Sequence, residues 1–429
     1  MDVLGDLLPR VSGSWPGPLS QQATDRLASA ECPALTQRRA RRSERSGAPQ
    51  DPIVWAEARG CNVRDVDGRI YVDLSAGFGA AAVGHSHPRI VEALQQQSAR
   101  LIHALGDLHP SDVKIALLER LTTLFDYPTR AMLGLSGADA VEAALKTALL
   151  FTNRPGVLAF EGGYHGLSHG PLSACGYSPA FRTPFAAQLN PHVTFAPYPR
   201  DESSLRASLQ SVTAAISGGA IGALLVEPIL GRGGVVVPPA QFLPELSELC
   251  RKHKVLLICD EIMTGLGRTG AWFAHTATNM TPDLICIGKA LGAGMPISAC
   301  IGREPIMQAW GTPDHEALHT GTFFGQPLAC AAALANLDIL SEERLPERAL
   351  QLEAHLRTKI PNLRGAGLLL GLPLDAPARA LHRMQALLER GFITVPAGAD
   401  ASVLSLTPPL TITTTQLDAF TTALEELQS

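Results

Sequence analysis

Short apolar runs that alternate with longer amphipathic segments constrain the fold of this chain more than any other feature. The runs have the length and composition of buried strands, and six precede Gly325: "GVLAF", "VTFAPY", "IGALLVEPI", "VLLICDEI", "LICIGKA" and "SACIGR". Residues 138–151 and 240–254 lie beside these runs and carry apolar residues at helical spacing. The alternation predicts an α/β fold whose mainly parallel sheet is covered by helices on both faces.

The two ends of the chain predict a second, smaller α+β unit. Residues up to about 50 are rich in Pro, Ser and Arg and suggest an extended arm with one helix near 22–30. "NVRDVDGRIYVDL" alternates around Asp67-Gly68, which predicts a hairpin. A helical stretch at 327–340 is followed by "GLLLGLPL", "GFITVPA" and "VLSLTPPLTI". We therefore expect residues 1–75 to form the arm and part of the small domain, 76–325 a large domain, and 326–429 the rest of the small domain.

Composition narrows the cellular setting and the partners. The net charge of -5 provides no general field that would attract nucleic acid or membrane lipid. One basic run breaks this balance, but it lacks interleaved aromatic residues and is interpreted as a solvated arm or an interface strip: Arg38, Arg39, Arg41, Arg42 and Arg45. The 8 cysteines form no CxxC pair, and neither a secretory leader nor an apolar stretch of membrane-spanning length is recognised. A cytoplasmic protein is expected.

A glycine motif within "DEIMTGLGRTG" imitates a dinucleotide-binding site. Gly265, Gly267 and Gly270 spell GxGxxG, which in such a site opens a helix directly after a strand. Here residues 261–264 intervene, and residues 271–282 lack a helical pattern. The next acid, Asp283, precedes an apolar run, which is the wrong place for a ribose partner. We reject a nicotinamide site on these grounds.

Polar residues at the ends of the apolar runs are the first candidates for chemistry, because ligands of parallel sheets bind beyond the carboxyl ends of the strands. Glu227, Asp260 and Lys289 occupy such positions. A lone lysine there is more often structural, but desolvation would lower its pKa and make its amine a nucleophile toward an aldehyde. A buried lysine beside a buried aspartate suits pyridoxal phosphate, since the lysine bonds the aldehyde and the carboxylate keeps the pyridine nitrogen protonated.

Two further motifs meet the remaining needs of that cofactor. "GLSGADAVEAALK" places Ser136, Gly137 and Ala138 before a helix, where free amides and the helix dipole can hold a phosphate. The alternative is an ordinary helix start with Asp139 in its first turn. "EGGYHGLSHG" contributes Tyr164, which can lie flat on a pyridine ring or simply pack against its neighbours.

The chain resembles the class III aminotransferases of the fold-type-I pyridoxal phosphate enzymes, the group of ornithine, acetylornithine and 4-aminobutyrate aminotransferases. The resemblance extends from about Ile53 to the C-terminus. It depends on "DLSAGFG", "GHSHP", "SGADAVEAALK", "YHG", "VEPI", "CDEIMTGLGRTG", "GKALGAGMP", "HTGTFFGQPLACAAALA" and "PPLTIT". It implies the fold-type-I transferase architecture for the large domain.

The resemblance also implies roles for individual residues. Lys289 would be the Schiff-base lysine and proton shuttle, and Asp260 would bind the pyridine nitrogen. Thr322 would reach the phosphate of the neighbouring subunit, which makes the active unit a homodimer with shared sites. The remaining cofactor-binding residues would supply phosphate amides, the stacked ring and the surrounding wall: Gly137, Ala138, Tyr164, Glu227 and Ile262. No metal is expected, since His85 and His87 of "GHSHP" have no third ligand in view.

Four positions bear on the substrate or depart from the family pattern. Many members carry Gln at the position of Met263, and methionine cannot donate the same hydrogen bond to the cofactor's phenolic oxygen. In ornithine and 4-aminobutyrate types, "EPIQGE" ends in a Glu that pairs with an arginine before "PPL", whereas here Arg232 and Ser405 occupy the two positions. One hypothesis is that Arg232 binds a substrate carboxylate from the opposite wall; the alternative is a solvent-facing Arg232 and a substrate without that carboxylate. Phe78 is expected to line the pocket.

The sequence therefore predicts an enzyme that moves an amino group from an amine or ω-amino acid to a 2-oxo acid by a ping-pong mechanism. An amino-acid epimerase or racemase, or a decarboxylase of the same family, would use the same site and remains an alternative. A catalytically silent scaffold or partner protein is the alternative from another class. Intact Lys289 and Asp260 argue against it.

Overall fold

The computed structural model describes residues 3–13, 15–33, 37, 40–41, 43–44, 47, 52–311 and 316–427. Of the basic run near the start, only Arg41 falls within these ranges, and the other four arginines lie outside the described residues. Within the described ranges, no helix is both long and apolar enough to cross a bilayer.

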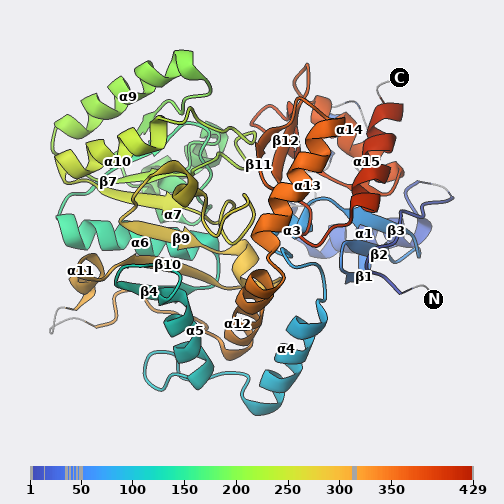
Figure 1. Ribbon diagram of the computed structural model, residues 1–429, viewed down its shortest axis with the longest axis horizontal. Helices are drawn as coiled ribbons and strands as arrows, with labels where there is room; N and C mark the ends of the chain where they lie inside the picture. The colour runs from blue at the N-terminus through green and yellow to red at the C-terminus, as the bar shows by residue number, and fades with distance from the viewer. Residues whose placement is uncertain are drawn as a thin grey trace.

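A seven-stranded sheet forms the centre of the large domain (Figure 1). Its strand order is β4-β10-β9-β8-β7-β5-β6. Neighbours among β5 to β9 are parallel, and β10 is antiparallel to both β9 and β4. The bounds are β4 Thr129–Gly134, β5 Gly156–Phe160, β6 Val193–Ala196, β7 Ile221–Val226, β8 Leu256–Asp260, β9 Leu284–Ile287 and β10 Ser298–Arg303. All six predicted runs are strands, and the mainly parallel α/β fold is confirmed.

Helices cover both faces of this sheet, as the uninterrupted apolar runs require. Successive side chains of a strand point to opposite faces, so Leu224 of β7 packs with α9 and α10 in one core, while Leu225 packs with α6 in another. The predicted helical segments at 138–151, 240–254 and 327–340 are confirmed. The helices named here are α6 Gly137–Thr152, α9 Glu202–Ser217, α10 Phe242–His253 and α12 Pro327–Glu342, with α4 Pro88–Arg100 and α5 Asp112–Thr122 beside α12.

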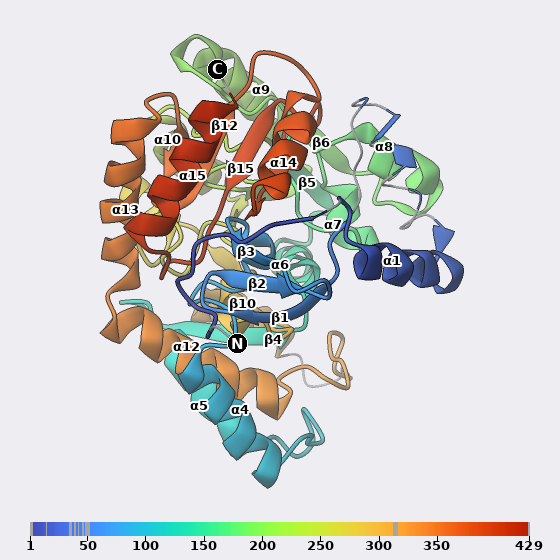
Figure 2. The same ribbon diagram turned by 90° about the vertical axis from the view of Figure 1, so that its right-hand side faces the viewer.

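The N- and C-terminal segments together build the smaller α+β part (Figure 2). The hairpin around Asp67-Gly68 is confirmed, and its second strand pairs in parallel with β13 from the far end of the chain. One sheet contains β1 Trp55–Arg59, β2 Asn62–Asp65, β3 Ile70–Asp73 and β13 Phe392–Ile393. The other contains β11 Arg364–Ala366, β12 Leu369–Pro373, β15 Val403–Leu406 and β14 Val395–Ala397. The helices of this part are α1 Pro18–Ala30, α13 Leu345–Lys359, α14 Arg379–Glu389 and α15 Thr414–Glu426.

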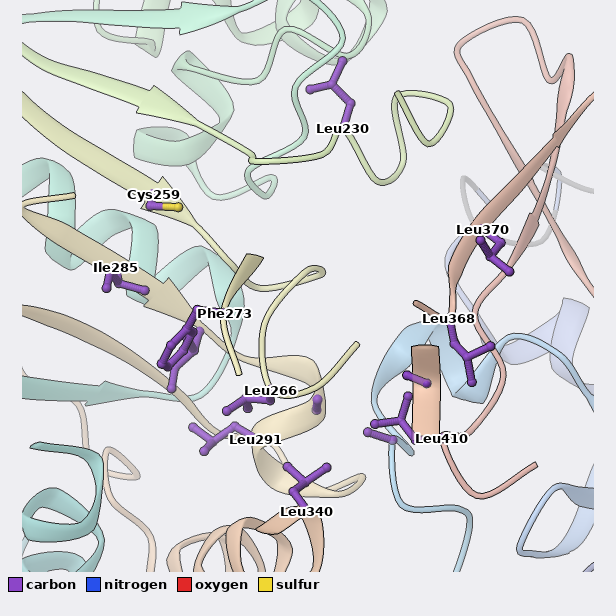
Figure 3. Close-up of a cluster of buried hydrophobic side chains, with 14 of the residues drawn as sticks. Leu230, Cys259, Leu266, Phe273, Ile285, Leu291, Leu340, Leu368, Leu370 and Leu410 are labelled. Atoms are coloured by element: carbon purple, nitrogen blue, oxygen red, sulfur yellow. The ribbon is translucent and has the colours of Figure 1, made fainter. Parts of the chain in front are cut away.

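One apolar core joins the two parts. Figure 3 shows Leu266 and Leu291 of the large domain in the same buried cluster as Leu340, Leu368 and Leu410 from the C-terminal third of the chain. The large sheet is therefore packed directly against the C-terminal elements. The domain boundaries near residues 75 and 325 stay a prediction.

The GxGxxG motif makes a turn that packs against those C-terminal elements. Gly267 and Gly270 have φ angles of 89° and 92°, and only a short 3-10 helix at Ala274–Thr278 lies between them and β9, where dinucleotide binding would require an α-helix opened by the glycines. A Cβ at Gly270 would lie 2.2 Å from Cδ2 of Leu350. The glycines are needed for backbone conformation and close packing.

Candidate active site

Three polar residues emerge together at one edge of the large sheet. Glu227 follows β7, Asp260 ends β8, and Lys289 follows β9 by two residues. Since these strands are parallel neighbours, their carboxyl ends lie side by side, as the sequence predicts. Asp260 is 3% exposed and Glu227 is 5% exposed, so both carboxylates are held away from water.

The start of α6 meets the lysine segment at this edge. A Cβ on Gly288 would lie 3.6 Å from Cα of Gly137, and Ile262 contacts both glycines: its Cδ1 is 2.7 Å from a Cβ built at Gly137, and its Cγ2 is 3.6 Å from one built at Gly288. The Asp260 segment, the Lys289 segment and the helix start therefore converge. Any bulkier residue at position 137 would force them apart.

Lys289 is held in a strained backbone conformation with its amine poorly solvated. Its φ of 37° lies in the left-handed region, which side-chain-bearing residues rarely adopt outside functional sites. Burial lowers the pKa of the Lys289 ammonium below its ordinary value; Asp260 and Glu227 oppose this shift, and Arg232 reinforces it. A lowered pKa leaves more of the amine in its nucleophilic form.

Asp260 has a partner that sequence reasoning missed. Nδ1 of His165 lies 2.7 Å from Oδ2 of Asp260, and the amide of Ile262 donates to Oδ1 at 3.0 Å. Burial of His165 opposes its charged form, but the hydrogen bond and charge of Asp260, with the charge of Glu227, raise the His165 pKa. The signal was available in "YHG", one residue after Tyr164.

Glu227 ties two loops of the site together. Its Oε1 accepts a hydrogen bond from the amide of Tyr164 at 2.8 Å, and its Oε2 accepts one from the amide of Gly231 at 3.0 Å. Burial raises the pKa of Glu227 to about 7, while His165 and the two amides act in the opposite direction. This carboxylate therefore fixes the loop of Tyr164 relative to the loop of Arg232.

The N-terminus of α6 has the features of an anion site. Ser136 and Asp139 form a reciprocal capping box, with Asp139 Oδ2 accepting from the Ser136 amide at 2.9 Å. The amides of Gly137 and Ala138 have no acceptor within the described part of the chain. Two free amides at a helix start, together with the helix dipole, favour a phosphate group.

Arg232 lies in a cage of three aromatic rings. Its Cζ is 4.3 Å from the ring centroid of Tyr164, 4.8 Å from that of Tyr177 and 5.5 Å from that of Phe181. Within the described ranges no carboxylate forms an ion pair with it. The guanidinium therefore lies against the three rings and is not turned freely into solvent.

The turn of Phe78 lies next to this edge, because a Cβ built at Gly79 would be 3.6 Å from Cδ of Lys289. Phe78 is 70% exposed and sits in a turn with φ of 63°. Asp73 holds this turn, because its carboxylate binds the Ser75 and Gly77 amides and His85. His85 thus has a structural partner.

Ser405 and Thr322 occupy contrasting environments. Ser405 is buried in β15 between β12 and β14, and two residues later Thr407 donates to the carbonyl of Ser75 at 3.1 Å. The C-terminal strand therefore ends beside the Phe78 turn. Thr322 is exposed and makes no hydrogen bond to the described residues of its own chain.

Glu261, next to Asp260, has a purely structural environment. It accepts hydrogen bonds from Thr264 Oγ1, from the amides of Ala274 and His275, and forms one with His275 Nδ1 at 2.9 Å. Cys259, Glu261 and His275 form a cluster of potential metal ligands, and all three are buried. The hydrogen bonds to Glu261 already account for its burial.

Residues 44–427 match the profile of the family described as aminotransferase class-III. The chain belongs to the class III aminotransferases. This aminotransferase is 40% identical over 387 residues to the acetylornithine aminotransferase of Mycobacterium tuberculosis, covering 87% of this chain and 91% of the relative. It is 34% identical over 385 residues to that of Methanosarcina acetivorans, covering 88% and 92% of the two chains.

Solved structures agree. The ornithine aminotransferase of Toxoplasma gondii superimposes with a TM-score of 0.79 at 32% identity, covering 87% of the aminotransferase and 90% of that chain. An (S)-enantioselective omega-transaminase of Thermomicrobium roseum gives a TM-score of 0.85 at 28% identity, covering 97% and 100%. The predicted family, the fold-type-I architecture and the aminotransferase activity are confirmed, and class III aminotransferases depend on pyridoxal phosphate.

The residues at this edge of the sheet fit such a cofactor. The cradle of free amides at Gly137 and Ala138 matches a phosphate, and the buried Asp260 carboxylate matches a protonated ring nitrogen. Lys289 supplies the amine. Substituting Gly137 would fill the cradle, since its Cβ would meet Ile262.

Proposed function

We propose that this aminotransferase binds pyridoxal 5'-phosphate at the carboxyl edge of β7, β8 and β9 and uses Lys289 as its catalytic lysine. One observation carries the proposal: Lys289, with its pKa lowered by burial, follows β9 where the start of α6 and the Asp260 segment converge. The charges of Asp260 and Glu227 oppose the lowering of the Lys289 pKa by burial, which supports an interaction among the three groups. The match to class III aminotransferases supports the same assignment.

Each residue has a role in this proposal. When bound, pyridoxal phosphate supplies an electron sink for the bond that breaks at the substrate carbon. Lys289 would hold the cofactor through Nζ until the amine of the donor takes its place, and the freed Nζ would then take and return the proton of the substrate carbon. Asp260, oriented by His165, stabilises the protonated ring nitrogen. The other residues of the site bind the phosphate or enclose the ring: Gly137, Ala138, Tyr164, Glu227, Ile262 and, toward the phosphate of the partner subunit, Thr322.

Chemical trapping tests the assignment of Lys289. We expect the protein supplied with pyridoxal phosphate to turn yellow and borohydride to fix the cofactor on the peptide that contains Lys289. Lys289→Ala should abolish both the trapped adduct and activity, whereas Lys252→Ala, at an exposed position on α10, should retain both. Trapping on a different lysine would refute the proposed site.

Amino transfer also predicts a stoichiometric half-reaction. Donor alone should release one oxo product per site and then stop until a 2-oxo acid is added, because the amino group must leave before the next turnover. Continuous turnover with donor alone, accompanied by loss of optical rotation or of carbon dioxide, would indicate epimerisation or decarboxylation instead. The donor we propose is an amine or ω-amino acid that enters past Phe78.

Arg232 is proposed to bind the carboxylate of the 2-oxo acid. The cage leaves the guanidinium without an acidic partner, and its planar N–H fork suits bidentate binding of a carboxylate. The position of the second arginine in the ornithine and 4-aminobutyrate types is held here by Ser405, which is buried and uncharged.

The free energy of that charge-assisted interaction, about 1.5 to 3 kcal/mol, sets the expected result. Arg232→Ala should raise KM for pyruvate and 2-oxoglutarate roughly tenfold or more with kcat largely kept. Unchanged KM values for both acceptors would refute the binding of their carboxylate by Arg232, here called the clamp.

A homodimer with shared active sites, located in the cytoplasm, completes the proposal. Thr322 lies exposed among apolar side chains that lack cover in a single chain, including Leu318 and Phe323. A second copy of the chain would bury them and bring Thr322 to the partner's phosphate. Seven of the free cysteines are buried thiols, which fits a reducing compartment.

A further inference from the structure

Two of the three rings around Arg232 come from one segment, and they lie outside the buried apolar clusters. Tyr177 and Phe181 are half-buried, and neither ring belongs to one of the buried apolar clusters. Phe181 is in α8 (Pro179–Arg182), and Tyr177 lies two residues before that helix begins. The two ring centroids are 5.9 Å apart.

The three rings restrain the guanidinium without using its hydrogen-bonding capacity. Cation–π contact involves the faces of the aromatic rings, and the centroids of Tyr164 and Tyr177 lie 6.1 Å apart with their planes at 87°. Two roughly perpendicular walls therefore limit where the guanidinium can rotate. Its N–H groups remain for an incoming anion.

The cage is also tied to the C-terminal part of the chain. The hydroxyl of Tyr177 donates to the carbonyl of Gly398 at 3.1 Å, and the amide of Gly398 donates to the carbonyl of Arg232 at 2.9 Å. Gly398 lies between β14 and β15 with φ of 81°. Through Gly398, these two bonds link the Tyr177 side chain and the Arg232 backbone to the loop between β14 and β15.

We infer that Tyr177 and Phe181 are positioning residues that hold Arg232 ready for a substrate carboxylate, and so set the preference of this enzyme for 2-oxo acids over uncharged carbonyl acceptors. The inference depends on the proposed role of Arg232. A free arginine must lose rotamer freedom when it binds, and a caged one has lost that freedom beforehand. Removing a ring should therefore weaken carboxylate binding while the guanidinium is still present.

Steady-state kinetics of the holoenzyme tests this inference. The acceptors are 2-oxoglutarate and pyruvate, and the donor is an aromatic monoamine without a carboxylate. For Tyr177→Leu and Phe181→Leu we expect the acceptor KM to rise about 3- to 10-fold per ring, with kcat and the monoamine KM kept. Tyr177→Phe and Phe181→Tyr retain a ring face and should return the acceptor KM toward the wild-type value.

Phe185→Leu provides the matched control. Phe185 is exposed on the same segment and contacts His169 at a centroid distance of 5.9 Å, away from Arg232. Its acceptor KM should equal that of the wild type.

The possible failures are distinguishable. If Arg232→Ala raises the acceptor KM but neither leucine variant does, the cage inference is overturned and the clamp stands. If Arg232→Ala has no effect either, the clamp itself fails and the cage inference falls with it. A lower kcat together with similar increases in the acceptor KM and the monoamine KM would show a general structural effect. That result would also overturn the positioning role.

Discussion

His165 shows how a buried charge network can be hidden from sequence reasoning at the scale of one residue. The strand-end residues Glu227, Asp260 and Lys289 were predictable because parallel strands place their carboxyl ends together. The position of His165 depends on a glycine-hinged loop that folds back over the sheet, and no local periodicity encodes that path. Its Nε2 is buried without a partner, so the ring is fixed mainly by its 2.7 Å contact with Asp260.

The raised pKa of His165 predicts the sign of a pH effect on stability. A group whose pKa is higher in the folded than in the unfolded state stabilises the fold fully below its ordinary value of 6.5, and this contribution is lost as pH rises through the folded-state pKa. His165→Asn retains a donor but cannot carry the charge. Urea unfolding of matched preparations should therefore show the largest wild-type advantage below pH 6.5 and a shrinking one at alkaline pH.

His192→Asn, at an exposed site, is the control for this measurement. Its stability relative to the wild type should be independent of pH. A wild-type advantage over His165→Asn that grows with pH would contradict the proton assignment.

Arg268 connects two elements far apart in the chain. It lies in the glycine-rich turn after β8, is 2% exposed, and donates from Nη1 to the carbonyls of Leu368 at 3.2 Å and Pro408 at 2.5 Å. Burial lowers the pKa of Arg268 to about 10, and only the charge of Asp73 opposes this shift. The "GLGRTG" turn therefore works as a docking element for β12 and the segment after β15.

Truncation of this side chain should be strongly destabilising. Arg268→Ala leaves a cavity and two carbonyls without their donor, which together cost about 3 kcal/mol or more of the free energy of unfolding. Arg268→Met fills most of the space and relieves the buried charge, so its loss should be smaller. Guanidinium unfolding midpoints of the two variants would measure the difference.

Arg251→Ala gives the comparison for an exposed arginine. Arg251 pairs with Glu248 on the surface of α10 with 75% of its side chain accessible, and such exposed pairs contribute little to stability. If Arg268→Ala is tolerated as well as Arg251→Ala, the docking role is wrong.

The elements that could be predicted from the sequence are those with uninterrupted apolar patterns. Strands β5 and β7 to β10 are largely buried apolar runs, β6 is a partly exposed one, and α6, α10 and α12 follow helical spacing over several turns. The edge strand β4 was missed because only its last two residues are fully buried and its start is polar. The helices α9, α4 and α5 were not singled out either. The cage around Arg232 was equally unpredictable, since its rings come from separate loops.

At the scale of the whole molecule, one surface exposes several large apolar side chains to solvent. Two loops, at 101–108 and 318–323, meet there: Gln326 donates to the carbonyl of Ile102 at 2.9 Å, and His103 lies 5.4 Å from the ring of Phe323. Their exposed apolar side chains, here called the loop surface, are Leu101, Ile102, Leu105, Leu108, Leu318 and Phe323. Contiguous apolar patches of this kind mark protein interfaces. Because Thr322 lies within the loop surface, dimer formation and completion of the cofactor site should be a single event.

This coupling predicts the effect of a charge placed on the loop surface. Leu108, 76% exposed, would be buried in a dimer, where an unpaired carboxylate costs several kcal/mol. Leu108→Glu should therefore shift the protein toward monomer in sedimentation velocity and reduce the pyridoxal phosphate it retains after gel filtration. Leu149→Glu, on α6 at 48% exposure, should remain dimeric and keep its cofactor. A monomeric Leu108→Glu protein that retained cofactor and activity would show that each chain builds a complete site alone, and would remove Thr322 from the site.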